Sequence, residues 1–178
     1  LSPSADPNDT NRDDEQNFSH HYVRRVPAEV LLDAISEVTG SPESFPGRPR
    51  GTRAIELWDN RLPSYFLDTF GRSERTSPCE CGRSGEPTMA QALHLMNAPE
   101  VSAKIAQSTG RIARLLQASP PIADATMIEE LTLVTLGRLP TEKERSVAQG
   151  LFANTARRDA AEDYLWTLLN SYDFLFVR

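Results

Sequence analysis

The chain has few of the residues on which many functional sites depend. Its 178 residues include only two cysteines and three histidines. A structural zinc site needs four ligands, and the first two are usually cysteines with two to four residues between them. No apolar run approaches the roughly 20 residues of a membrane-spanning helix. The composition therefore predicts no membrane insertion, and it gives little support to a metal centre.

Motifs of common catalytic chemistry are missing too. The sequence contains no G-x-S-x-G elbow, no H-E-x-x-H pair, no glycine-rich phosphate loop and no calcium loop. It also lacks the C-x-x-C-H sequence that attaches c-type haem, so no cofactor is expected in this chain. Whether the chain is part of an enzyme is uncertain from the sequence.

Lysine is scarce as well. Lys104 and Lys143 stand against seventeen arginines, and the formal net charge is −6. This acidic balance argues against general nucleic-acid binding, which needs a basic face. The arginine fork suits carboxylates and phosphates, but a GC-rich genome would give the same bias without any binding site, and that simpler interpretation is favoured.

What is present is the pattern of an all-α protein. Apolar residues recur at helical spacing in 27–40 and again through 88–178, which predicts an irregular multi-helix bundle. Thr141 and Glu144 predict a helix that starts with a capping box. The first helix should bury Val30 and expose an acidic stripe. The acidic stripe consists of Glu29, Asp33 and Glu37. Val147 should be buried, and the last helix should reach Tyr172. The predicted core consists of Leu93, Leu115, Leu131, Leu151, Leu165 and Leu168.

The segment 41–87 has a different texture. Prolines, glycines and arginines interrupt it, so its regular structure must be short. A short strand is expected at 53–58 and a short helix at 63–70, within a mostly irregular segment that wraps around the bundle. Residues 1–26 are a polar, acidic lead-in. Residues 27–178 are therefore expected to form a single helical domain.

Cys79 and Cys81 are the sharpest local feature. Residues two apart can bring their Cα atoms to about 5–7 Å, which allows a disulfide. A structural disulfide is favoured, and two free thiols remain open. The weaker alternative is a metal or redox site that would add His94 to the two cysteines.

The arginines of the irregular segment raise a second possibility. Seven arginines and five acidic residues lie between 48 and 83, a net charge of +2 in a chain of −6. If these arginines converge, they form an anion-binding surface. The candidate anion or partner contacts are Arg72, Arg75, Arg83 and Thr88, the last of which begins a predicted helix. The favoured alternative is that the arginines pair with local acids and with carbonyl groups of the segment.

Four sequence blocks carry a family resemblance. They are "VRRVPAEVLLDAISEVTG", "PSYFLDTFGR", "CECGRSGEPTMAQALHLMN" and the closing "LGRLPTEKE…YLWTLLNSYDFLFVR". Together they resemble a planctomycete-expanded domain family of unknown function, which is found C-terminal in large proteins that also carry a planctomycete cytochrome-c-like domain. The resemblance runs from about Asn17 onward. Residues 1–16 look like the preceding part of the same domain, so this chain looks like its C-terminal half.

The resemblance implies an exported protein, in a periplasmic, cell-envelope or extracellular setting. Such compartments are oxidising, which favours the disulfide. The expected partners are other domains of the same parent polypeptide, with haem only on a separate domain, and an acidic extracellular polymer. The expected function is a non-catalytic structural or interaction module. The alternative is part of a hydrolytic or redox enzyme with a site near the C-x-C loop.

Overall fold

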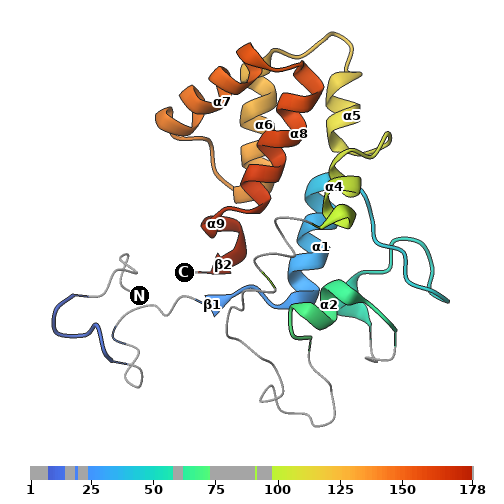
Figure 1. Cartoon of the computed structure of the whole chain (residues 1–178), viewed down its shortest axis with the longest axis vertical. Helices are drawn as coiled ribbons and strands as arrows, with labels where there is room; N and C mark the ends of the chain where they lie inside the picture. The colour runs from blue at the N-terminus through green and yellow to red at the C-terminus, as the bar shows by residue number, and fades with distance from the viewer. Residues whose placement is uncertain are drawn as a thin grey trace.

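In the computed structural model, the described residues are 8–14, 19, 24–57, 62–72, 91 and 98–177. Their fold is helical, with a two-stranded sheet (Figure 1). This confirms the all-α prediction. The elements in chain order are β1 (Arg24–Arg25), α1 (Ala28–Thr39), the 3₁₀ helix η1 (Ala54–Glu56), α2 (Tyr65–Thr69), α4 (Pro99–Ile105), α5 (Arg111–Leu116), α6 (Asp124–Leu136), α7 (Glu142–Asn154), α8 (Arg157–Leu169), α9 (Tyr172–Leu175) and β2 (Phe176–Val177).

The predicted first helix is confirmed as α1. Pro27 precedes it, and Gly40 ends it in the left-handed conformation, with φ 65°. Leu31 and Ile35 of α1 are fully buried. The prediction for Val30 is wrong, because its side chain is 39% exposed. Contacts with η1, α2, α4 and α5 surround α1 on other sides and turn Val30 outward.

The acidic stripe of α1 is not a solvated face. Glu29 is buried, and the side chain of Asp33 is only 10% exposed. Glu37, one turn further, is exposed as predicted. The spacing of the stripe places all three acids on one side of the helix. That side is not open to solvent along its whole length, because η1 packs against α1.

The strand predicted at 53–58 is wrong, because residues 54–56 form η1. The β-branched and aromatic residues favour a strand locally, but Asp33 supplies the first turn of a helix with an acceptor for its N–H groups. The short helix predicted at 63–70 is confirmed as α2, and Ser64 caps its first turn by accepting a hydrogen bond from the N–H of Leu67.

The C-terminal half is a bundle in which α6, α7 and α8 pack on one another. Figure 1 shows this bundle at one end of the molecule and α1 with α2 at the other; α4 lies between them, and α5 lies beside α8. Of the six leucines predicted for the core, three are buried, namely Leu131, Leu165 and Leu168. Leu115 and Leu151 are half-buried. Leu93 lies outside the described residues.

The predicted start of α7 is confirmed. The side chains of Thr141 and Glu144 each accept a hydrogen bond from the other's backbone N–H, which is a capping box. The buried face was misjudged at Val147, which is 69% exposed, because α6 and α8 contact the side of α7 that carries Ala148. The last helix also ends earlier than predicted, at Leu169, and a half-exposed Tyr172 begins α9.

The residues just before α1 and just after α9 meet in the small sheet. Arg24 pairs with Val177 and Arg25 with Phe176 in an antiparallel ladder. The N–H of Val26 also donates to the carbonyl oxygen of Leu175, at 3.0 Å. The last residues of the predicted lead-in are therefore part of the fold. Among the described residues, none of the helices combines the length and the hydropathy that a membrane span requires.

Candidate functional site

Most site residues predicted from the sequence lie outside the described part of the chain. These are the two candidate disulfide partners, the histidine of the alternative metal site and three of the four anion contacts: Cys79, Cys81, His94, Arg75, Arg83 and Thr88. Their roles stay predictions. The structure places only Arg72 of the predicted site.

Arg72 is held by its own segment. Its Nη1 donates to the carbonyl oxygen of Leu62 at 2.8 Å, and its Nε lies 2.8 Å from the carboxylate of Asp68. The side chain is largely buried. Arg72 thus has the environment that the alternative interpretation expects, in which an arginine pairs with a local acid and a carbonyl group.

Other arginines bind carbonyl groups at the ends of helices. The Nε of Arg111 donates to the carbonyl of Val38 near the end of α1, at 2.7 Å. Arg158 binds the carbonyl of Ala106 at the end of α4, and Arg25 binds the carbonyl that follows α2. The last carbonyl groups of a helix lack partners within the helix and form its negative pole. These arginines therefore cap helices from elsewhere in the fold.

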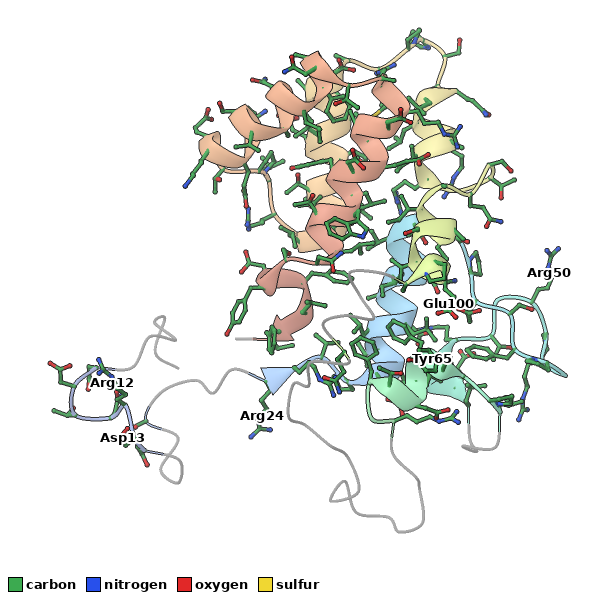
Figure 2. The ribbon with its side chains drawn as sticks, viewed as in Figure 1. Arg12, Asp13, Arg24, Arg50, Tyr65 and Glu100 are labelled. Atoms are coloured by element: carbon green, nitrogen blue, oxygen red, sulfur yellow. The ribbon has the colours of Figure 1, made fainter. Side chains whose placement is uncertain are left out.

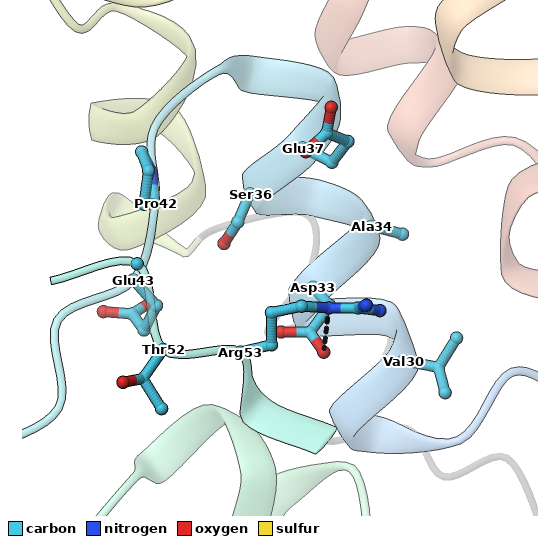
Figure 3. A pocket seen from close by; sticks show the side chains of 10 residues that line it. Val30, Asp33, Ala34, Ser36, Glu37, Pro42, Glu43, Thr52 and Arg53 are labelled. Atoms are coloured by element: carbon cyan, nitrogen blue, oxygen red, sulfur yellow. Dashed lines mark ion pairs between the residues drawn. The ribbon is translucent and has the colours of Figure 1, made fainter. Parts of the chain in front are cut away.

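Two open grooves flank the base of segment 41–53. The first groove has a volume of about 540 Å³ and lies between α1 and that segment (Figure 3). The second groove, of about 450 Å³, lies between α2, α4 and the other side of the segment. Pro42 and Glu43 line both. Both volumes fall in the range of small-molecule sites, so these grooves are the candidate functional site.

Asp33 dominates the chemistry of the first groove. One carboxylate oxygen accepts the N–H of Ala54 at 2.6 Å, and the other accepts the N–H of Ile55 at 3.1 Å. Arg53 lies over the same carboxylate, with its Nε 3.6 Å away, as the dashed line in Figure 3 marks. Both oxygens are thus engaged, and Asp33 fixes the end of segment 41–53 on α1.

Lys104 plays the corresponding part in the second groove. Its Nζ lies 2.8 Å from the carbonyl oxygen of Ser41, 3.3 Å from the hydroxyl of Ser36 and 3.2 Å from the carboxylate of Glu43. The side chain is 11% exposed. Lys104 therefore joins α4 to α1 and to the start of segment 41–53.

The outer wall of the second groove is more accessible. Phe45 and Phe66 are buried at its base, whereas Tyr65 is 68% exposed and Glu100 is also exposed. Among the residues that the structure describes, no three His, Cys, Asp or Glu side chains are grouped to hold a metal ion.

In the described part of the chain, the largest shift in the pKa of a carboxyl group lies away from both grooves. Arg138 donates two hydrogen bonds of 2.8 Å to Glu144 and one of 3.0 Å to Asp173. The hydrogen bonds from Arg138 lower the pKa of Glu144 to about 2, against an ordinary value of 4.5. This cluster ties α7 to α9 and carries no sign of a reactive group.

The sequence did not reveal the residues that build the grooves. Its pattern assigned Asp33 to a solvated stripe, and the scarcity of lysine was the sole sequence signal at Lys104. The backbone and hydroxyl groups that these two side chains bind lie between 21 and 68 positions away along the chain. Local patterns carry no information on such contacts.

Comparison with known proteins identifies a family. The family described as "Protein of unknown function (DUF1553)" matches residues 1–152. No curated protein and no solved structure matches the chain. The match includes residues 1–16 and ends within α7, so α8 and α9 lie beyond the matched residues.

Proposed function

We propose that this chain, which belongs to the DUF1553 family, is a non-catalytic structural and interaction module of a larger exported protein. Its partners are other domains of the same polypeptide, including a cytochrome-c-like domain that carries the haem. The resemblance of the four sequence blocks to planctomycete proteins of that organisation supports this assignment. The protein acts in the periplasm, in the cell envelope or outside the cell.

The main support for a non-catalytic role is that the charged side chains of the grooves bind the protein scaffold. A general acid or base needs a proton-transfer site that faces a substrate. Asp33 instead binds two backbone N–H groups, and Lys104 binds a carbonyl, a hydroxyl and a carboxylate of the scaffold. These contacts fix the shape of the surface around segment 41–53. A fixed and exposed surface suits contact with another protein domain.

The grooves favour a protein partner over an acidic polymer. Asp33, Glu37 and Glu43 line the first groove against Arg53, and Glu43 and Glu100 line the second against Lys104. Carboxylates outnumber cations in both. An acidic polymer would meet like charge at either groove.

A bond between Cys79 and Cys81 belongs to the same proposal, because an exported protein meets an oxidising compartment. The test is the intact mass of the unreduced, denatured chain after treatment with iodoacetamide, with metal analysis of the same sample. We expect no alkyl label, a mass two hydrogens short of the reduced chain, and no stoichiometric metal.

Two alkylated thiols with stoichiometric metal would contradict the module and support the alternative, an envelope enzyme with its site at the C-x-C loop. Two alkylated thiols without metal would remove the disulfide from the proposal. Dithiothreitol-reduced chain, which must take up two labels, is the matched control.

A further inference from the structure

The polar lead-in contains an asparagine in the pattern that N-glycosylation requires. Residues 8–10 read Asn-Asp-Thr, an N-x-S/T sequence whose middle residue is not proline. All three residues are exposed. Attached glycans are bulky and lie on surface segments of exported proteins. The pattern is short and also arises by chance, so the local structure must show whether it marks a site.

The side-chain oxygen of Asn8 accepts three hydrogen bonds. The hydroxyl of Thr10 donates to Oδ1 at 2.7 Å, the backbone N–H of Thr10 at 3.0 Å and the N–H of Asn11 at 3.1 Å. Asparagine forms turns of this kind when its side chain binds the backbone two residues on. The N–H of Asn8 also donates to Oδ1 of Asn11, at 2.7 Å. The carboxamide of Asn8 is therefore fixed by its own segment.

The side-chain nitrogen of Asn8, by contrast, makes no hydrogen bond to any described residue. A carboxamide nitrogen becomes a nucleophile when it gives up a proton and negative charge moves onto the oxygen. Donors that already point at that oxygen stabilise the charge as it develops. Asn8 thus has its oxygen prepared and its nitrogen open to a reactant.

A second asparagine has the same pattern but a different environment for its hydroxyl residue. Residues 17–19 read Asn-Phe-Ser, and Asn17 itself lies outside the described residues. The hydroxyl of Ser19 donates to the carboxylate of Asp14 at 2.5 Å. The hydroxyl of Thr10 donates to Asn8 instead. Of the two asparagines, Asn8 is therefore expected to be the better acceptor.

The surroundings of Asn8 leave room for a large group. Figure 2 shows the turn that carries Arg12 and Asp13 apart from the helices of the fold. Asp9, the middle residue of the pattern, forms an exposed ion pair of 3.6 Å with Arg12. This pairing offsets the negative charge next to the acceptor, which favours the approach of an anionic glycan donor.

We propose that Asn8 is an N-glycosylation site. Its Nδ2 attacks the anomeric carbon of a glycan that is joined to a lipid through a diphosphate. The carbon–nitrogen bond forms, the bond from carbon to the diphosphate oxygen breaks, and the lipid diphosphate leaves with the electron pair. The proton of Nδ2 passes to a base of the transferase. This inference rests on the exported setting proposed above, where such donors and transferases act.

Glycan transfer to the purified full chain tests the acceptor. The probes are an N-acetylglucosamine disaccharide linked to dolichol by a diphosphate and a single-subunit oligosaccharyltransferase that accepts N-x-S/T. Trypsin cleaves after Arg12 and so places Asn8 and Asn17 on different peptides, whose masses report each site separately. We expect Asn8 to be labelled severalfold faster than Asn17. Equal or slower labelling of Asn8 overturns the inference.

Substitutions separate the sequence pattern from the turn. Thr10→Val should abolish labelling of Asn8, and Thr10→Ser, which keeps the hydroxyl, should retain it. Asn11→Ala keeps the pattern but removes the acceptor of the Asn8 N–H, so it should slow labelling. Ser19→Ala is the matched control, because it removes the pattern at Asn17 and should leave Asn8 unchanged. Labelling of Thr10→Val or Asn11→Ala at the native rate contradicts the role of the turn.

Protein isolated from its own cells distinguishes this inference from the proposed function. Cell fractionation locates the chain, and the mass of the peptide that ends at Arg12 reports the state of Asn8. We expect an exported chain with a glycan on Asn8. An exported chain with unmodified Asn8 overturns the glycosylation and leaves the proposed setting in place. A chain confined to the cytoplasm overturns the setting and the glycosylation together.

Discussion

At the scale of single residues, charged side chains bind backbone groups that belong to other elements. Asp33 accepts two N–H groups of η1 across at least 21 positions of sequence, and Arg111 donates to a carbonyl of α1 across 73. Such contacts satisfy backbone groups that a helix end leaves unpaired. A chain rich in arginine can therefore place its cations inside the fold, without a binding site for each.

Asp33→Ala should destabilise the chain. The substitution leaves the N–H groups of Ala54 and Ile55 without their acceptor, and loss of a comparable helix cap costs about 1–2 kcal/mol. Urea unfolding, followed by circular dichroism, measures the change in the free energy of unfolding. Glu37→Ala is the control, because Glu37 lies one turn further along α1 and is exposed. Equal losses for the two variants would refute the capping role of Asp33.

Glu144 should make stability depend on pH. Its folded pKa of about 2 lies below the ordinary value of 4.5, so the folded state favours the ionised form. The stabilisation is complete above about pH 4.5 and is lost as the pH falls towards 2. Native chain should therefore melt above Glu144→Gln at pH 7, and the gap in Tm should narrow below pH 4.5. A gap that is constant from pH 7 to pH 3 would contradict the assigned pKa.

At the scale of elements, the local sequence predicts where helices end better than it predicts which face of a helix is buried. Gly40 and the pair Thr141 and Glu144 were sufficient to place the end of α1 and the start of α7, because each acts on backbone groups within a few residues. Val147 was misplaced because the direction of a helix face depends on its neighbours in space. For the same reason, the strand expected at 53–58 is η1, which Asp33 caps from α1.

The end of α1 provides a prediction with a built-in control. Gly40 and Gly47 have similar positive φ, of 65° and 72°. A Cβ at Gly40 would displace the flexible end of the Arg114 side chain and lie 3.2 Å from the backbone nitrogen of Arg111, which gives way less easily, whereas at Gly47 it meets nothing within 4 Å. Both alanine variants carry the backbone strain of about 1 kcal/mol. Gly40→Ala should therefore show the larger fall in Tm in thermal denaturation, and equal falls would argue against the packing at Gly40.

At the scale of the whole molecule, α8 is central. It contacts α4, α5, α6, α7 and α9, and it supplies Leu165 and Leu168 to the core. The residues that match the DUF1553 family end before it. The helical fold of this chain therefore extends beyond the residues that match the family.

The candidate site was the least predictable part of the molecule. The sequence pointed to the C-x-C loop and to four anion contacts, and of these site residues only Arg72 lies in the described part of the chain. The grooves instead arise where α1, α2, α4 and segment 41–53 meet. Because these segments come from separate regions of the chain, their shared surface is a property of the tertiary fold. Composition did indicate an acidic protein, which agrees with the carboxylates along both grooves.

The two-stranded sheet determines how the molecule would respond to tension. Because β1 and β2 are antiparallel and Arg24 pairs with Val177, the chain enters and leaves at the same end of the ladder. A force that pulls Arg24 and Val177 apart would load the hydrogen bonds of the ladder one after another, so they would break in sequence from that end. The ladder and then α9 would peel away before the load reached α8. The two-stranded sheet is therefore the part of the fold that such a force would load first.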